Sequence, residues 1–107
     1  MDTFSVSITK PAENDLRDIA RYISSQLNAP QAALNLIDAI YNAIEKLETD
    51  ALIYPYIRDD RLAALGYRPL LIKNYIVFFI VNEKDKTVDV DRILYARRDW
   101  KNIIKEH

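Results

Sequence analysis

Two periodicities of apolar residues divide this chain of 107 residues. Apolar and polar residues alternate over residues 3–9, which predicts a half-buried strand. A helical period follows and predicts an amphipathic helix over residues 11–27, capped by Thr9, and a second helix after Pro30. The apolar positions that define the two helices are Leu16, Ile19, Ile23 and Leu27, then Ala33, Ile37, Ile40, Ile44 and Leu47. Because a proline displaces the residue before it from the helical region, we expect two antiparallel helices joined by a short turn.

The second half of the chain shows the two-residue period of strands. A connector over residues 50–66 comes first, and its residues 62–65 are expected to form a short helical turn. Three strands are then predicted, Tyr67–Ile72, Tyr75–Asn82 and Thr87–Tyr95, and the short loops between them indicate an antiparallel meander. The only glycine, Gly66, is expected to need a positive φ or a close approach. A short helix is expected in the tail, over residues 98–105.

The middle strand of this meander is apolar on both faces, over residues 76–81. An antiparallel sheet with one wet face alternates apolar and polar residues, so something must cover each face of this strand. The helix hairpin can cover one. For the other face two outcomes stay open: the tail folds back and completes the core, or an apolar patch remains for a partner.

The last strand breaks its own alternation. Val88 and Val90 share a face with Arg92, so strict alternation would bury an arginine. A bulge near Asp91 would repair the register with one unpaired residue. We expect such a bulge to turn the end of the strand, residues 95–98, toward a common groove.

Composition limits the chemistry of the chain. Half of the residues are apolar, enough for one compact core, so we expect a single domain over residues 1–107. No apolar run reaches the roughly 18 residues of a membrane span, and the first residues do not resemble a signal peptide; we expect a soluble, cytoplasmic protein. The chain has no cysteine, and its one histidine is His107. This excludes disulfides, zinc sites and a Ser-His-Asp triad, and no metal or cofactor is expected.

Basic residues gather in the second half of the chain. Residues 1–50 carry four Lys and Arg against eight Asp and Glu, whereas residues 51–107 carry eleven against eight. An anionic partner would therefore meet the second half, although a mixed surface of this kind is also ordinary.

The paired arginines after the last strand are the main candidates for recognition. Arg97 and Arg98 lie between Tyr95 and Trp100. Because successive strand residues face opposite sides, we expect one arginine in the groove and the other paired with Asp99 or with a partner. Trp100 is expected to anchor the tail.

Other polar and aromatic residues have two readings. Arg68 could bind an anion, or it could pair with a local carboxylate such as Asp59 or Asp60. The tyrosines of the helices and the meander, Tyr22, Tyr41 and Tyr75 among them, are expected at the rim of the core.

Three segments together resemble a known family. They are AENDLRDIARYI after the opening strand, then LGYRPLLIKNYIVFFIV, then VDVDRILYARRDW. In this order and spacing they resemble the RelE/ParE superfamily of toxins from bacterial type II toxin–antitoxin systems, over residues 4–100. The resemblance implies an α+β domain: an N-terminal strand, a helix hairpin, a three-stranded antiparallel meander forming one twisted sheet, and a short C-terminal helix.

The resemblance also implies a role and a partner. Members of the superfamily inhibit growth, act in plasmid stabilisation and are neutralised by a cognate antitoxin protein. We expect the antitoxin to cover the apolar face of the middle strand and the tail, at Ile76, Phe78, Ile80 and Trp100. We expect no membrane contact and no direct sequence-specific DNA binding.

The target separates two branches of this superfamily. Members that cleave messenger RNA on the ribosome need a base, charge stabilisation for the phosphate and an acid for the leaving oxygen. Lys73 matches one of their lysines, Arg98 or Arg97 matches their last-strand arginine, and Tyr95 stands where a histidine often occurs. Leu71 and Ile76, however, stand where a second lysine and an arginine are found.

These departures favour the ParE-like branch, whose members act on DNA gyrase and lack the nuclease residues. In that reading Arg68, Arg97 and Arg98 bind the target or another anion. The alternative is ribosome-dependent cleavage of messenger RNA with Arg98, Lys73 and Tyr95 as catalytic residues, so whether the chain is an enzyme stays open. A third reading is a protein-binding module without toxicity.

Overall fold

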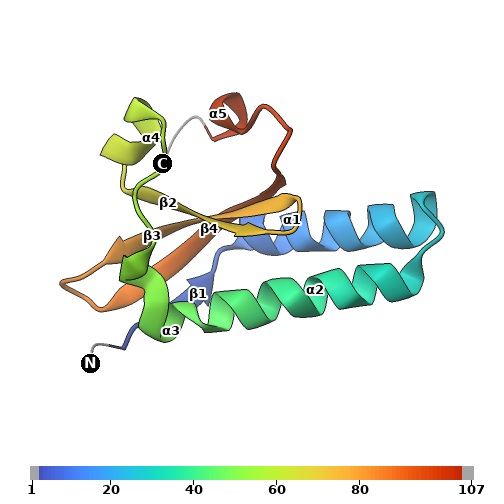
Figure 1. Ribbon diagram of the computed structural model, residues 1–107, viewed down its shortest axis with the longest axis horizontal. Coiled ribbons are helices and arrows are strands. Elements are labelled where there is room, and N and C mark those ends of the chain that lie inside the picture. Colours follow the sequence, from blue (N-terminus) through green and yellow to red (C-terminus); the bar gives the residue numbers. More distant parts are fainter. Residues whose placement is uncertain (1–2, 105–107) are drawn as a thin grey trace.

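The computed structural model describes residues 3–104 and has an α+β fold built on a four-stranded sheet (Figure 1). Its strands are β1 (Ser5–Ile8), β2 (Tyr67–Ile72), β3 (Tyr75–Asn82) and β4 (Thr87–Tyr95), in the order β1-β4-β3-β2. Strands β2, β3 and β4 form the predicted antiparallel meander with the predicted bounds, whereas β1 pairs parallel to β4. The first strand is shorter than the predicted residues 3–9, and at its end Thr9 is the cap of the helix that begins at Lys10.

The helix hairpin follows β1. It consists of α1 (Lys10–Arg21), one π-helical turn (Tyr22–Gln26) and α2 (Pro30–Glu45), and short helical turns α3 (Leu47–Asp50) and η2 (Ala51–Ile53) continue it. The Thr9 hydroxyl caps α1 by accepting a hydrogen bond from the Ala12 amide at 3.3 Å. The prediction of one regular helix over residues 11–27 is wrong at its end, because the last turn widens to a π-helix before Asn28 reverses the chain at φ +50°.

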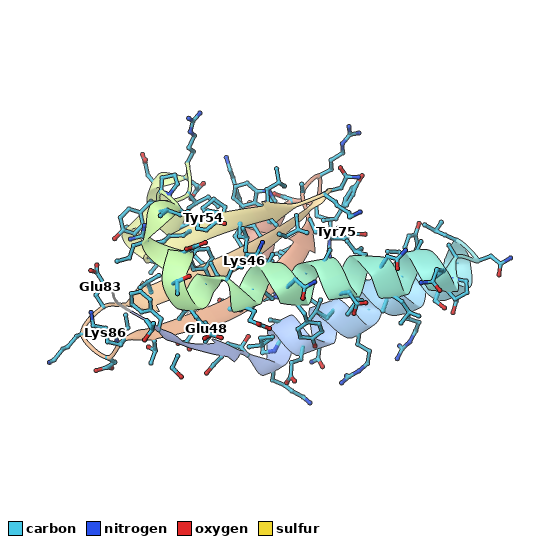
Figure 2. The ribbon with its side chains drawn as sticks, turned by 60° about the horizontal axis from the view of Figure 1, so that its bottom comes forward. Lys46, Glu48, Tyr54, Tyr75, Glu83 and Lys86 are labelled. Carbon is cyan, nitrogen blue, oxygen red and sulfur yellow. The ribbon has the colours of Figure 1, made fainter. Side chains whose placement is uncertain are left out.

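The hairpin packs on one face of the sheet and forms the larger core. Figure 2, viewed from this side, shows α2 in front of the strands, with Tyr54 near α3 and Tyr75 further toward the hairpin tip. The buried residues of this core come from the helices and from the inward positions of the strands: Phe4, Ala12, Leu16, Leu36, Ile40, Ile44, Leu47, Ala51, Leu70, Val77, Phe79, Val88, Val90 and Ile93.

The opposite face of the sheet is covered by the chain itself. The helices α4 (Asp60–Ala64) and α5 (Trp100–Ile103) lie over it, as Figure 1 shows. Phe78 is fully buried there, and its ring centroid lies 5.4 Å from that of Trp100. The buried members of this second core are Ile57, Leu62, Tyr67, Phe78, Leu94 and Ile104. The sequence left open whether the tail or a partner covers this face of the middle strand. In the structure the tail folds back over it and completes the core.

A β-bulge interrupts β4 where the sequence predicts one. Phe78 pairs with Arg92 and Phe79 pairs with Val90, which leaves Asp91 as the extra residue. The Thr9 hydroxyl donates to the Asp91 carbonyl at 3.0 Å, and the Tyr67 hydroxyl donates to the Asp91 carboxylate. The bulge is thus tied to the start of α1 on one side and to β2 on the other.

Gly66 has the positive φ that the sequence predicts, +94°, and it ends the turn between α4 and β2. Lys73 also has a positive φ, +53°, in the two-residue turn between β2 and β3. Within residues 3–104, no helix is both long and apolar enough to cross a membrane.

Candidate functional site

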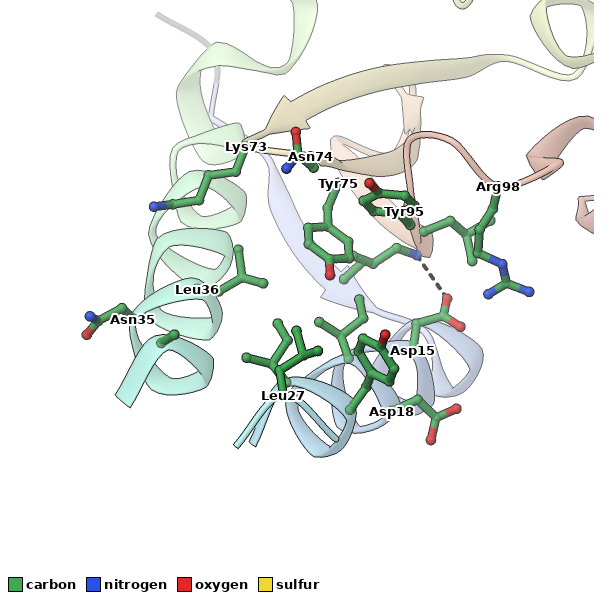
Figure 3. Close-up of a pocket in the computed structure, with 16 residues that line it drawn as sticks. Asp15, Asp18, Leu27, Asn35, Leu36, Lys73, Asn74, Tyr75, Tyr95 and Arg98 are labelled. Atoms are coloured by element: carbon green, nitrogen blue, oxygen red, sulfur yellow. Dashed lines mark hydrogen bonds between the residues drawn. The ribbon is translucent and has the colours of Figure 1, made fainter. Parts of the chain in front are cut away.

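A cleft of about 920 Å³ opens between the tip of the helix hairpin and the adjoining ends of β3 and β4 (Figure 3). One wall is formed by α1 through Ile19, by the π-helical turn through Tyr22 and by Leu27 directly after that turn, and the turn between β2 and β3 contributes Lys73. Tyr22 and Leu27 are more than half exposed, at 55% and 56%. The cleft is therefore an open depression, lined by apolar side chains and three tyrosines together with charged and amide groups.

Two tyrosines on neighbouring strands form the aromatic part of the cleft. Tyr75 and Tyr95 pair across β3 and β4, and their ring centroids lie 5.6 Å apart at an interplanar angle of 64°. Burial raises the pKa of Tyr75, and the nearby hydroxyls of Tyr95 and Tyr22 raise it further. Tyr75 therefore presents a neutral hydroxyl to the cleft.

Charged groups of both signs border the aromatic pair. Figure 3 shows Lys73 and Arg98 on opposite sides of Tyr75 and Tyr95. Asp15 and Asp18 of α1 supply negative charge from the other wall. The Asp15 carboxylate is engaged, since it accepts hydrogen bonds from Arg92 Nε at 2.8 Å and from the Ile93 amide at 2.9 Å. Lys73 and Arg98 are exposed, and so is Asp18.

The structure brings together the three residues predicted for nuclease chemistry. Lys73, Tyr95 and Arg98 all line the cleft, although they are far apart in the sequence. Their catalytic role stays a prediction. Arg97 does not line the cleft and is exposed in the turn after β4, where the Arg98 amide donates to the Tyr95 carbonyl at 3.0 Å.

The premise that Arg97 and Arg98 are strand residues is wrong, because β4 ends at Tyr95. The expected difference between the two side chains is nevertheless present, because Arg98 lines the cleft and Arg97 does not. Asp99 was expected to pair with one of them, but its carboxylate accepts a hydrogen bond from the Asn102 side chain at 2.6 Å.

Arg68 lies away from the cleft, on β2, and is only 8% exposed. Its Nη1 donates to the Tyr54 carbonyl, and its guanidinium carbon lies 4.2 Å from the centroid of the Tyr56 ring. The prediction that it pairs with Asp59 or Asp60 is wrong. Asp59 instead accepts from the Leu62 amide at 3.0 Å and lies 3.8 Å from the Lys101 ammonium.

The four residues predicted for antitoxin binding belong to the second core. Phe78 is fully buried, and Ile76, Ile80 and Trp100 are partly buried around it. Phe78 therefore offers no surface to a partner in this structure. Trp100 anchors the tail, as the sequence predicts, and contact of these four residues with an antitoxin stays a prediction.

Sequence reasoning missed three residues of the cleft, Tyr22, Leu27 and Tyr75, which it assigned to the rim or face of the core. The available signal was Leu27, an apolar residue at the very end of the helix, one position before the turn. Within residues 3–104, no three His, Cys, Asp or Glu side chains gather in a way that could hold a metal ion.

Comparison with known protein families gives a match over most of the chain. The model of the ParE toxin of the type II toxin–antitoxin system parDE matches residues 6–100. The chain belongs to the ParE toxin family. It is thus a toxin-family member of the RelE/ParE superfamily, as the resemblance implied.

Solved toxin–antitoxin structures share the fold of this ParE-family chain. One is the chromosomal ParDE system from P. aeruginosa, with a TM-score of 0.73 and 22% identity, covering 89% of this chain and 98% of the other. Another is the RelBE2 complex from Mycobacterium tuberculosis, with a TM-score of 0.59 and 15% identity, covering 87% and 98%. A comparison with curated protein sequences found no match. The predicted α+β fold is confirmed.

Proposed function

We propose that this ParE-family chain arrests bacterial growth in the cytoplasm by binding DNA gyrase, without catalysis, and that a cognate antitoxin protein neutralises it. Family membership supports a toxin of this branch. The observation that carries the choice of target is the make-up of the cleft, which is aromatic and apolar with few cations.

Cleavage of RNA through the 2′-hydroxyl would need more than this cleft offers. The reaction requires a base for that hydroxyl and an acid for the leaving oxygen. Asp15 is held by Arg92 and Ile93, which leaves exposed Asp18 as the other carboxylate of the cleft, and the raised pKa of Tyr75 makes that tyrosine a poor base. Ile76, at the position where the nucleases carry an arginine, is partly buried in the second core rather than in the cleft. Leu71, at the second lysine position, also lies outside the cleft lining.

The same cleft suits a protein surface. Exposed Tyr22, Leu27 and Tyr95 provide large contact areas with few rotatable bonds. Lys73, Arg98 and Asp18 surround them with both signs of charge, which favours one orientation of a protein partner. An aromatic centre with a charged rim is the usual composition of a protein–protein contact.

The second candidate function is ribosome-dependent cleavage of messenger RNA. The meeting of Lys73, Arg98 and Tyr95 at one cleft favours it. Two cations could stabilise charge on a phosphate, and a tyrosine beside them could donate a proton.

Inducible expression in bacteria, with and without the neighbouring gene that would encode the antitoxin, tests both candidates. Growth should stop only when the chain is expressed alone, with gyrase trapped on cleaved DNA and messenger RNA intact. Messenger RNA cut at ribosome-occupied codons would support the second candidate instead. Normal growth would refute toxicity. The remaining interpretation would then be a protein-binding module without toxicity.

Paired variants separate the two mechanisms further. The double variant Tyr22→Ala and Leu27→Ala removes apolar contact area but no cation, so it should relieve growth arrest under the gyrase mechanism. Arg98→Ala should abolish RNA cleavage under the nuclease mechanism and leave the fold intact, because Arg98 is exposed.

A further inference from the structure

Arg68 is a buried cation that pairs with no carboxylate within residues 3–104. Within residues 3–104 its only contacts of polar or cation–π type are those of Nη1 with the Tyr54 carbonyl and of the guanidinium face with the Tyr56 ring. Its Nε is buried and has no hydrogen-bond partner in this part of the chain. A buried charge that lacks a full set of partners is costly, so such a group points to a missing one.

Arg92, a partly buried arginine of the same fold, shows what such a partner looks like. Arg92 donates from Nε and Nη2 to the two carboxylate oxygens of Asp15, at 2.8 and 2.9 Å. A planar guanidinium and a carboxylate match in this side-on, two-bond geometry. In Arg68, the Nη1 bond to Tyr54 and the ring stacking of Tyr56 leave the same Nε and Nη2 edge unused.

We propose that the Nε and Nη2 edge of Arg68 binds a carboxylate, an Asp or Glu side chain supplied by a protein partner. Tyr56 stacks on the face of the guanidinium, whereas a carboxylate binds in its plane, so both contacts can exist together. Nε is buried in the free chain, and binding therefore requires the atoms that cover it to move aside.

The connector around Arg68 has the character of a contact surface. Ile53 and Tyr56 are exposed, at 73% and 54%, and residues 54–59 form no helix or strand. An acidic residue flanked by apolar residues would complement the buried cation and these exposed side chains. The identification of this partner as the antitoxin rests on the proposed function; the carboxylate site itself does not.

Side-chain NMR of the full chain tests the site without any partner. The Nε–H signal of Arg68 is assigned by its loss in Arg68→Met, and sodium acetate is added at constant ionic strength. The signal should shift and saturate, whereas the Nε–H signal of Arg92, already bonded to Asp15, should stay in place. An unmoved Arg68 signal would overturn the proposal, and a shift with inorganic phosphate but not with acetate would overturn the carboxylate assignment.

Binding to the product of the neighbouring gene then tests the partner. Arg68→Met should weaken binding at least about tenfold, because a buried hydrogen-bonded charge pair is lost. The control Arg58→Met removes an exposed arginine from the same connector and should change binding less than about twofold. If Arg68→Met fails to fold, Arg68→Lys replaces it. Lysine keeps the charge but lacks the paired N–H donors of the guanidinium, so this variant should also weaken binding.

The two failures can be told apart. Wild-type chain that does not bind the neighbouring gene product refutes the proposed function, and the acetate titration still decides whether Arg68 holds a carboxylate. Equal affinity of wild type and Arg68→Met for that product refutes the antitoxin as the source of the carboxylate.

Discussion

Asp15 holds Arg92 across the end of the parallel strand pair. Its two carboxylate oxygens accept from Arg92 Nε and Nη2, and one of them also accepts from the Ile93 amide at 2.9 Å. Strand β1 ends at Ile8, so beyond it Asp15 supplies the hydrogen bond that a neighbouring strand would otherwise give to β4. The hydrogen bond to Asp15 also raises the pKa of Arg92. This contact positions the part of β4 that leads to Tyr95 and the cleft.

Asp15→Asn should lower the free energy of unfolding by about 2 kcal/mol, because it removes the charge from a set of hydrogen bonds that is mostly shielded from water. Urea unfolding measures the change, and hydrogen exchange at the Ile93 amide should become faster. Asp18→Asn is the control, since Asp18 is exposed one helical turn away on α1. Equal losses in both variants would contradict the structural role of Asp15.

The hydroxyl of Tyr67 gives the fold a dependence on alkaline pH. Burial, together with the hydrogen bond to the Asp91 carboxylate, raises the pKa of Tyr67 far above its usual value. A tyrosine in the unfolded chain ionises near pH 10, about the ordinary value. Above that pH the unfolded chain loses a proton that the folded chain keeps, so stability is unaffected by this group below about pH 10 and falls as the pH rises further.

Tyr67→Phe should remove this alkaline loss while costing some stability near neutral pH through the lost hydrogen bond. Urea midpoints measured between about pH 8 and about pH 11 for both proteins give the comparison. Burial also raises the pKa of Tyr75, and this group lowers alkaline stability equally in the wild type and the variant. The difference between their urea midpoints therefore reports on Tyr67 alone. Parallel curves would contradict the buried, hydrogen-bonded state of Tyr67.

Trp100 closes the second core from the tail. Trp100→Ala should lower the free energy of unfolding by about 2 kcal/mol, since its partly buried ring covers Phe78. Tyr41→Ala is the control, because Tyr41 is 46% exposed on α2. Thermal unfolding measures both. A Trp100 variant as stable as the Tyr41 variant would indicate that α5 does not contribute to the core.

Gly66→Ala should destabilise the fold by about 1 kcal/mol through backbone strain at φ +94°. A Cβ there would lie 3.6 Å from the Ile80 Cγ2, an ordinary contact, so crowding adds little. Urea unfolding is again the measurement. Gly66→Asn is the matched control at the same position, and it should cost less because asparagine tolerates a positive φ better than alanine does. Equal losses in the two variants would show that backbone strain is not the cause.

Local chemistry predicted the meander well. The Lys73-Asn74 turn separates β2 from β3, and the four polar residues 83–86 separate β3 from β4. The strands β2, β3 and β4 therefore have the bounds expected from sequence. The break in alternation at Arg92 also predicted the bulge, because a charged residue on a buried face needs a register change.

Features that depend on distant partners were not predictable in this way. The apolar period does not change when a helix widens, so the π-helical turn left no signal, and the wall of the cleft that it forms was indicated only by the apolar Leu27 at the end of the predicted helix. The contacts of Arg68 depend on where the connector runs, and a nearby carboxylate in the sequence, Asp59, proved to be engaged elsewhere. Whether the tail would cover Phe78 depended on how α5 folds back, which periodicity does not encode.

The most direct test of the central claim uses the purified chain with purified DNA gyrase and relaxed plasmid. We predict that the chain inhibits supercoiling and traps cleaved DNA, and that the Tyr22→Ala and Leu27→Ala double variant does so less well. A gyrase reaction that the chain leaves unchanged, together with messenger RNA cut in a ribosome-containing translation reaction, would contradict the account.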